Sequence, residues 1–347
     1  MTNYVDWKFA TSAGTRLVPP GPDVSPEEAV EAVEEIRALA GQAVEPVAAT
    51  SRLRAPGDAP APLVIDRRTW IEVNAASMSG MLDPAFEAAS RRKTKEPSAA
   101  AQAVGSKITG AEAGGMLAFL STKVLGQYDL APDGDPALLL VAPNIVATER
   151  DIDAVPRDFR LWVCLHEETH RVQFTAVPWL RDHLVTNARS LAGDLMPDSE
   201  ALRTRLEQVT TQLPRVFSGD SQGLAELVIT PEQRERMAQV TAVMSLLEGH
   251  ADVVMDDVGP EHVPTVATIR ARFTKRRKGA GAVDRLLRRL LGLEAKMRQY
   301  RDGATFVRTV QDAVGVDGFN AVWTSPETLP TALEITEPAA WVQRVHG

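Results

Sequence analysis

Apolar residues recur along most of the chain with the three-and-four spacing of an amphipathic helix, and few stretches alternate as strands do. The segment 25–44 begins with a serine that can cap a helix and with two early acids. The segments 66–82 and 108–126 repeat apolar residues at helical spacing. Because glycine disfavours a helix, Gly114 and Gly115 predict that another helix packs closely against the second of these.

The best strand candidate is ALLLVAPNI at 137–145, which follows a predicted turn at 125–136. Pro143 near its end predicts an edge strand, because proline has no backbone N–H to donate. Downstream, Pro156 begins a helix and Pro178 ends it. Further helices are expected at 179–192, 198–213, 231–257 and 284–314, with a solvated basic turn at 274–282. The pattern predicts a mainly α-helical protein with a small β-sheet, an α+β fold.

A proline-rich connector, RAPGDAPAPL at 54–63, is the best candidate for a domain boundary. We therefore divide the chain into an N-terminal helical segment (1–53), a linker (54–65) and a main domain (66–347). The N-terminal segment is expected to pack on the main domain. A length of 347 residues suits one large domain or two moderate ones.

Composition narrows the class of protein. Hydrophobic residues make up 44% and charged residues 24%, which is typical of a globular protein in water. The net charge of −8 argues against a nucleic-acid-binding surface, and the basic residues at 274–278 lack interleaved aromatic residues. The single cysteine, Cys164, excludes an intrachain disulfide, and the longest apolar run is too short to span a bilayer. We expect a cytoplasmic protein that binds neither membranes nor nucleic acids; its oligomeric state stays open.

The most informative stretch is LWVCLHEETHRVQFT at 161–175, which contains the pattern H-E-x-x-H. His166 and His170 lie one helical turn apart, so both imidazoles can reach one Zn²⁺ ion. Glu167 lies beside that face and can act as general base, whereas Glu168 is turned about 200° from His166 and should point away. The alternative is a helix with hydrogen-bonded histidines and no metal. The continuous apolar run before His166 predicts a buried helix, where histidines need partners.

A hydrolytic zinc site needs a third protein ligand, and SLLEGHADVVMDD at 245–257 offers one. Glu248 and Asp252 lie four residues apart on a predicted helix, so Glu248 can bind zinc while Asp252 orients a ligating histidine. Their apolar neighbours argue against the alternative, a solvated acidic face. His250 competes as a ligand, but its position about 200° from Glu248 predicts a core histidine. We interpret Cys164 as a packing residue.

HEETH followed by EGHAD resembles the gluzincin pattern, in which a glutamate on a later helix completes the two-histidine site. The blocks VDWKFA, LGQYD, LLLVAPNI, HEETHRVQF, EGHAD, GLEAKMRQYRDG and PETLP together resemble a family of zincin-like hydrolases of high-GC bacteria. That family is often associated with deazaflavin coenzyme biosynthesis. The resemblance implies a zincin-like metallohydrolase core with extra helices.

In zincins an edge strand upstream of the metal helix pairs with an extended substrate, and LLLVAPNI is the candidate here, with an ordinary structural strand as the alternative. KMRQYRDG offers Arg298, Tyr300 and Arg301 to stabilise an oxyanion, with Tyr300 the first to test. A structural role is the alternative for all three.

We therefore expect a zinc-dependent hydrolase, and favour a metallopeptidase with Glu167 as general base. Its substrate would be a peptide or a small amide. One alternative is a non-peptide amidase that uses the same site on a small substrate. The other is a binding or scaffold protein that retains zinc with little turnover, which Glu167 argues against because a structural site needs no base.

Overall fold

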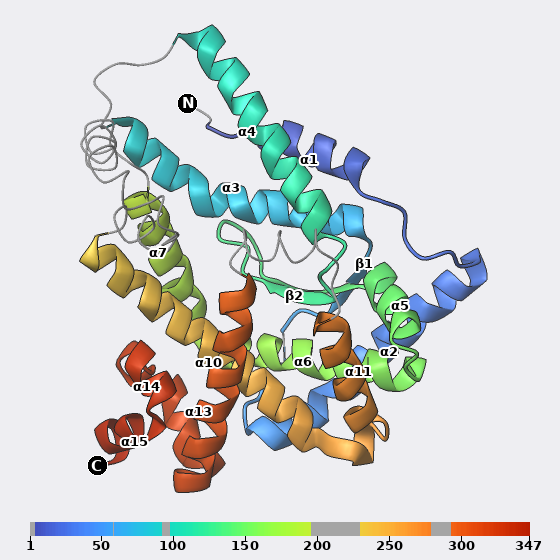
Figure 1. The fold of residues 1–347 in the computed structure, drawn as a ribbon, viewed down its shortest axis with the longest axis vertical. Coiled ribbons are helices and arrows are strands. Elements are labelled where there is room, and N and C mark those ends of the chain that lie inside the picture. Colours follow the sequence, from blue (N-terminus) through green and yellow to red (C-terminus); the bar gives the residue numbers. More distant parts are fainter. Residues whose placement is uncertain (1–3, 58, 92–97, 196–229, 279–292) are drawn as a thin grey trace, which may run out of the picture.

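The computed structural model describes residues 4–57, 59–91, 98–195, 230–278 and 293–347. Helices surround a small sheet (Figure 1), which confirms the predicted mainly α-helical fold. The helices are α1 (Trp7–Leu17), α2 (Pro26–Ser51), α3 (Arg67–Arg91), α4 (Ala99–Leu120), α5 (Ala142–Asp151), α6 (Pro156–Ala176), α7 (Pro178–Leu195), α10 (Pro231–His262), α11 (Val266–Lys278), α13 (Leu293–Phe319), α14 (Ala332–Thr336) and α15 (Pro338–His346). The strands are β1 (Leu63–Ile65), β2 (Gly126–Asp129) and β3 (Ala137–Val141), and two 3₁₀ helices are η1 (Asn320–Trp323) and η2 (Pro326–Thr328).

Local sequence signals explain where the principal helices begin and end. Ser25 caps α2 and exchanges hydrogen bonds with Glu28 in a capping box, as its position before the apolar pattern predicts. Thr230 and Gln233 form the same arrangement at the start of α10. Helix α6 begins at Pro156 and ends before Pro178, which confirms the boundaries expected for the helix that contains HEETH.

The sheet has the order β1-β3-β2, with β1 parallel and β2 antiparallel to β3. The prediction that 137–145 forms an edge strand is wrong, because β3 lies between two strands and ends at Val141. Pro143 instead occupies the first turn of α5, where a missing N–H costs nothing. The edge strand next to the HEETH helix is β2, which lies inside the predicted turn at 125–136.

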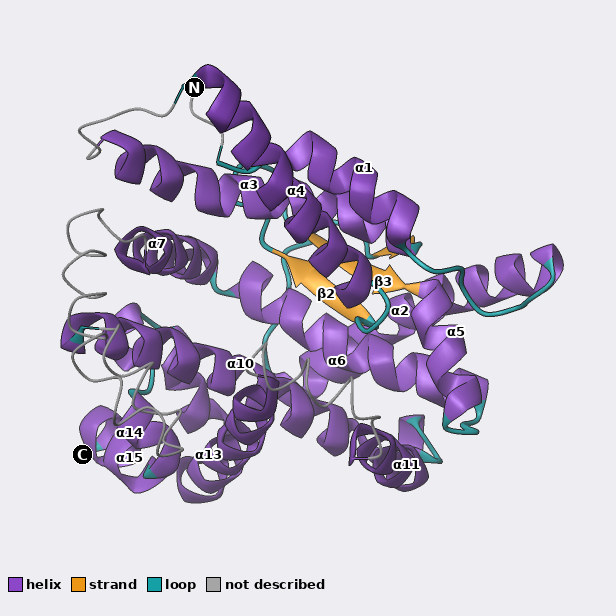
Figure 2. Ribbon diagram, turned by 45° about the horizontal axis from the view of Figure 1, so that its top comes forward, coloured by secondary structure: helices purple, strands orange, loops and turns teal. Residues whose placement is uncertain are grey.

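Helices cover both faces of the sheet (Figure 2). Leu139 and Val141 of β3 pack with Trp70 and Ile71 of α3 on one face. Leu140 packs on the other face with α2, α5 and α6. This alternation follows from the two-residue period of a strand, and it makes β3 apolar on both sides.

Helices α1 and α4 cross each other at close range. A Cβ on Gly114 would lie 2.5 Å from the carbonyl oxygen of Ala10 and 3.1 Å from the nitrogen of Gly14. The predicted close packing at Gly114 is thus confirmed, with α1 as the partner. Gly115 has no neighbouring atom within 4 Å of such a Cβ, so it takes no part in the crossing.

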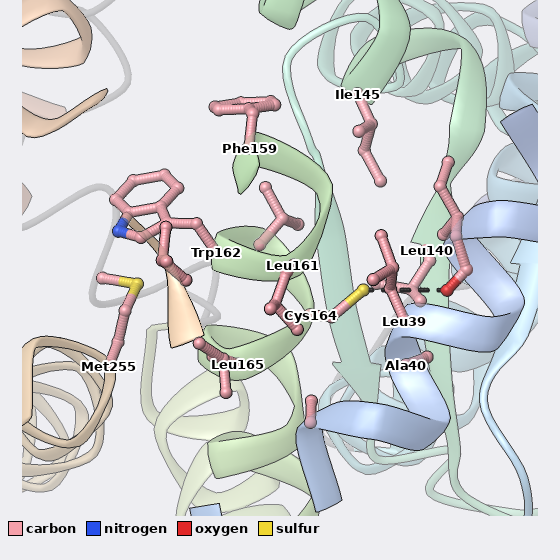
Figure 3. Close-up of a cluster of buried hydrophobic side chains, with 14 of the residues drawn as sticks. Leu39, Ala40, Leu140, Ile145, Phe159, Leu161, Trp162, Cys164, Leu165 and Met255 are labelled. Atoms are coloured by element: carbon pink, nitrogen blue, oxygen red, sulfur yellow. Dashed lines mark hydrogen bonds between the residues drawn. The ribbon is translucent and has the colours of Figure 1, made fainter. Parts of the chain in front are cut away.

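The apolar core on the Leu140 face of the sheet is centred on α6 (Figure 3). Cys164 is buried there, and its Sγ–H donates to the carbonyl oxygen of Ile36 over 3.8 Å. Burial raises the pKa of the Cys164 thiol, so the residue packs rather than reacts, as expected. Phe159 and Trp162 extend this core toward Phe273 of α11.

Helices α10 and α13 cross at two glycines. A Cβ on Gly303 would lie 1.9 Å from the carbonyl oxygen of Ser245, and one on Gly249 would lie 2.1 Å from the backbone of Gly303. Side chains of α13, η1 and α15 form the second large apolar cluster around this crossing, with Phe306, Phe319 and Trp341 fully buried. The crossing holds the C-terminal part of the chain against the helix that contains EGHAD.

Several expectations concern particular segments. Residues 63–65, in the predicted linker, form β1. Helix α1 packs on α4 and helix α2 packs on α6, while the division of the chain at 54–65 stays a prediction. Residues 274–278, predicted as a turn, continue α11, while 279–282, 198–213 and 284–292 lie outside the described residues. No described helix combines the length and apolarity that crossing a membrane requires.

Candidate metal centre

Three potential metal ligands converge from two helices. His166 and His170 lie one turn apart on α6, with their Nε2 atoms 3.2 Å apart. Glu248 of α10 places Oε2 3.6 Å from Nε2 of His166 and 3.7 Å from Nε2 of His170. Among the described residues these three form the group of histidine, cysteine and acidic side chains whose donor atoms lie close enough to hold a metal ion.

The spacing of these donors fits zinc. Ligand atoms about 2.0–2.1 Å from a tetrahedral ion lie about 3.3 Å from one another, close to the separations observed. Two imidazoles and one carboxylate with a free fourth position are also a donor set typical of catalytic zinc. The residues present therefore fit Zn²⁺.

The three potential ligands shift one another's pKa values. Burial raises the pKa of Glu248, but the hydrogen bonds from His166 and His170 outweigh it and hold the pKa well below its usual range. Burial lowers the pKa of His170, but the carboxylate of Glu248 outweighs that effect and raises the pKa to about 9. The cluster thus stabilises positive charge at the point where the donor atoms meet.

Glu167 is buried beside the ligands and faces the start of β2. A Cβ on Gly126 would lie 2.5 Å from Cγ and Cδ of Glu167, so only glycine leaves room for this carboxyl group. Burial raises its pKa, although His166 and His170 oppose the shift. Its Oε2 has no hydrogen-bond partner among the described residues. Glu167 is therefore a buried carboxyl group, and no hydrogen bond from the described residues occupies its Oε2.

Glu168 points away from the cluster, as its helical position predicts. Both of its oxygens accept hydrogen bonds from Arg171, from Nε and Nη2, each over 2.7 Å. This buried pair stabilises α6 from within and leaves Glu168 no route to the metal ligands.

A cavity of about 510 Å³ opens over the ligands. Its lining comes from β2 and its flanking residues, from α6 and α10, and from α7 and α11. Most of the lining side chains away from the ligands are apolar: Val124, Leu125, Leu130, Trp162, Val163, Phe174, Leu184, Met244, Leu247, Met255 and Phe273. The candidate metal centre therefore lies at the floor of a largely apolar cavity.

Within the described part of the chain, no strand pairs with the outer edge of β2, which lies at this cavity. Leu125 accepts a hydrogen bond from the backbone of Val141 over 2.8 Å, and antiparallel pairing then turns every second residue of β2 toward β3. The backbone groups of Gly126 and Tyr128 fall at the intervening positions and face outward. The ring of Tyr128 stacks on Phe174 of α6, with centroids 5.1 Å apart.

Gln173, which the sequence interpretation missed, contacts the outer nitrogen of a ligand. Its Oε1 lies 3.0 Å from Nδ1 of His170, and its Nε2 donates to the carbonyl oxygen of Leu247 over 2.9 Å. The same Nε2 lies 3.0 Å from Nδ1 of His250. Gln173 follows His170 by three residues, so helical spacing was the available signal.

His250 lies in the core. It is fully buried, and its ring contacts those of Phe319 and Trp323 at centroid distances of 5.4 and 5.3 Å. Burial and, to a lesser extent, His170 lower its pKa to about 3, so the ring is neutral. The position agrees with the expected core histidine.

The remaining expected site residues stay predictions. Asp252 lines the cavity, 3.7 Å from Nη2 of Arg270, and within the described part of the chain no hydrogen bond joins it to His166 or His170. Arg298, Tyr300 and Arg301 belong to α13, but their side chains lie outside the described residues. A role for Tyr300 at an oxyanion therefore stays an expectation.

Comparison with known proteins agrees with this geometry. The model of a family described as zincin-like metallopeptidase matches residues 5–342. A protein from Chloroflexus aurantiacus, whose crystal structure is described as that of a candidate hydrolase with a novel fold, is 30% identical, with 98% of each chain covered and a TM-score of 0.68. No curated protein matches. Neither match concerns deazaflavin coenzyme biosynthesis, so that association stays an expectation.

Proposed function

From the premise that the chain belongs to the zincin-like metallopeptidase family, we propose that it is a zinc-dependent peptidase. The main support for this proposal is the arrangement of four side chains at the floor of a cavity. His166, His170 and Glu248 converge there, and the buried carboxyl group of Glu167 lies beside them. The two imidazoles would hold the metal through Nε2 and Glu248 through a carboxylate oxygen. Zn²⁺ supplies Lewis-acid chemistry at such a site, polarising a carbonyl group and acidifying water.

Glu167 performs the proton transfers. Its carboxylate accepts the proton of the attacking water and then delivers it to the leaving amine. Two features support this role: its unpartnered Oε2 and the burial that raises its pKa, which together keep a proton acceptor ready without a competing hydrogen bond. Gly126 leaves the space in which the carboxyl group sits.

The unpaired edge of β2 favours a peptide as substrate. The outward backbone groups of Gly126 and Tyr128 offer an extended chain the hydrogen bonds of an added strand. Gly126 is also the residue in contact with Glu167, so a chain paired here would run past the general base. This role belongs to β2 and not to the strand at 138–145 first expected to fill it.

A small amide is the second candidate substrate, and the cavity favours it. A volume of about 510 Å³ lies within the range of sites for small molecules. A scaffold that only retains zinc fits less well, because no hydrogen bond from the described residues to Oε2 of Glu167 explains the burial of this side chain. We keep a cytoplasmic location, inferred from the single cysteine, as part of the proposal.

Asp252 is our candidate for orienting His166. Nδ1 of His166 has no hydrogen-bond partner among the described residues, whereas Nδ1 of His170 is taken by Gln173. Asp252 follows Glu248 by one turn of α10 and lines the same cavity. We propose that, with the metal bound, its carboxylate accepts a hydrogen bond from Nδ1 of His166.

The proposal is tested with purified protein, Glu167→Gln and Glu168→Gln. Each is assayed for zinc content and for cleavage of a broad peptide library and a panel of small amides. We expect about one zinc per chain in all three proteins, and Glu167→Gln should lower hydrolysis at least about 100-fold. Cleavage of small amides alone would move the substrate assignment to the amidase. Equal activity of all three proteins would refute a role for Glu167 as base.

A further inference from the structure

The side-chain amide of Gln173 has one orientation that satisfies its surroundings. The carbonyl oxygen of Leu247 can only accept, so the nitrogen end of the amide must face it across 2.9 Å. The oxygen end must then face Nδ1 of His170 across 3.0 Å. Gln173 is fully buried, so water cannot replace either partner.

This orientation determines the tautomer of His170. An amide oxygen only accepts, so Nδ1 of His170 carries the proton and donates it. With this proton held on Nδ1, the nitrogen left to bind a metal through its lone pair is Nε2, which faces His166 and Glu248. The hydrogen bond also sets the plane of the ring.

The second N–H of the amide extends the contact to His250. It points at Nδ1 of His250 over 3.0 Å, so that nitrogen accepts and the ring is neutral with its proton on Nε2. Phe319 at the end of α13 and Trp323 of η1 hold the ring in place. A continuous set of contacts therefore connects the C-terminal apolar cluster with a metal ligand.

We propose that Gln173 and His250 are positioning residues for the metal centre: His250 and the carbonyl of Leu247 hold the Gln173 amide, which fixes His170 as the Nδ1–H tautomer. This inference rests on the proposed function only for the presence of a metal. It assigns to a neutral amide the contact that a carboxylate commonly makes with a ligating histidine. A neutral partner orients the ring without raising its basicity as a carboxylate does.

The tautomer is measured directly in the wild-type protein with ¹⁵N-labelled histidine, both metal-free and loaded with zinc. We expect a slowly exchanging Nδ1–H on His170 in both forms, assigned by its absence in His170→Ala. An unprotonated Nδ1 on His170, or an Nδ1–H that exchanges with solvent as fast as that of an exposed histidine, overturns the inference. This measurement needs no variant of Gln173 to fold.

Zinc affinity gives the second readout, obtained by competition with a chelator. Gln173→Leu removes all three hydrogen bonds of the amide, to His170, Leu247 and His250, and should raise the Kd for zinc by roughly 10–100-fold. His250→Phe keeps an aromatic ring but loses the acceptor, and should shift the Kd in the same direction and speed exchange of the His170 Nδ1–H. The matched control is Thr169→Val on α6, where the side chain is also buried and its hydroxyl donates to the carbonyl oxygen of Leu165 in the same helix. Unchanged affinity in Gln173→Leu overturns the inference.

The two proposals fail separately. Zinc-loaded protein that hydrolyses no peptide or amide would refute the proposed function, while a slowly exchanging Nδ1–H on His170 would still support the role of Gln173. Hydrolysis together with an unprotonated Nδ1 would refute the role of Gln173 alone.

Discussion

Gly126 and Glu167 are in contact where the edge of the sheet meets α6: a Cβ on Gly126 would lie 2.5 Å from Cδ of Glu167. Gly126→Ala should therefore displace the carboxyl group while leaving the three metal ligands in place. We expect hydrolysis to fall by roughly 100-fold or more, the contribution typical of a general base, with zinc content unchanged.

Gly115→Ala on α4 is the matched control for that substitution. No atom lies within 4 Å of a Cβ there, and alanine favours a helix over glycine by about 1 kcal/mol. It should leave hydrolysis unchanged and raise the free energy of unfolding slightly. Equal activity of Gly126→Ala and wild type would show that Glu167 does not need its observed position.

The ligand assignment predicts a ranking of zinc affinities. Glu248→Ala should abolish tight binding, because it removes one of three donors, and His166→Ala or His170→Ala should do the same. His250→Ala should bind zinc at least 100-fold more tightly than Glu248→Ala, because His250 acts only through Gln173. Zinc titration of these variants checks the order, and tighter binding by Glu248→Ala than by His250→Ala would contradict it.

Asp252→Ala tests the orientation of His166. If Asp252 orients His166 as proposed, removing its carboxylate should raise the Kd for zinc by roughly 10–100-fold. Arg270→Gln serves as the control, since it removes the cation beside Asp252 but no carboxylate. If Asp252→Ala and Arg270→Gln both bind zinc like the wild type, Asp252 pairs only with Arg270 and orients no ligand.

Glu168→Gln should change stability and not chemistry. It leaves the guanidinium of Arg171 buried with a weaker partner, and breaking a buried ion pair costs about 3–5 kcal/mol when a charge is left uncompensated. The neutral amide retains part of the contact, so we expect a loss near the lower figure in denaturant unfolding. A large fall in hydrolysis by folded Glu168→Gln would contradict the separation of Glu167 from Glu168.

The Glu334–Arg344 pair predicts a sensitivity to acid. Burial raises the pKa of Glu334, but the hydrogen bonds from Arg344 outweigh it and leave the pKa lowered. A carboxylate with a lowered pKa in the folded state stabilises the fold above its unfolded pKa, about 4.3, and the stabilisation is lost as pH falls through the folded value. At pH 7, Arg344→Met should therefore have a lower free energy of unfolding than the wild type. Below pH 4 the difference in free energy of unfolding should be smaller.

Arg54→Met is the control for this effect. Arg54 makes two hydrogen bonds to Glu45, but both side chains are about two-thirds exposed, where ion pairs contribute little. The free energy of unfolding of Arg54→Met should equal that of the wild type at each pH. A parallel acid response of Arg54→Met and Arg344→Met would contradict the special role of the C-terminal pair.

The sequence predicted the helices with strong local signals and the residues one turn apart within them. The capping serine of α2, the prolines around α6, and the faces of Glu167 and Glu168 all depend on neighbours close in the chain. Such relations follow from helical geometry alone.

Relations between distant segments could not be predicted in the same way. The apolar run at 137–141 gave no sign that strands pair on both of its sides, and Pro143 fits a helix start as well as a strand edge. The contact between Gln173 and His250 spans 77 residues. Short β2, with glycine and aspartate at its ends, resembles a turn because its strand form depends on pairing with β3.

Three consecutive residues of α10 face three different partners: Glu248 the metal ligands, Gly249 the backbone of α13, and His250 the amide of Gln173. Successive residues of a helix differ by about 100°, so an inserted or deleted residue within this helix rotates all three contacts together. No single compensating substitution can restore a ligand, a backbone contact and a hydrogen bond at once. Related chains should therefore vary in length before Thr230 or beyond the kink at Gly259, and keep the number of residues between these two positions.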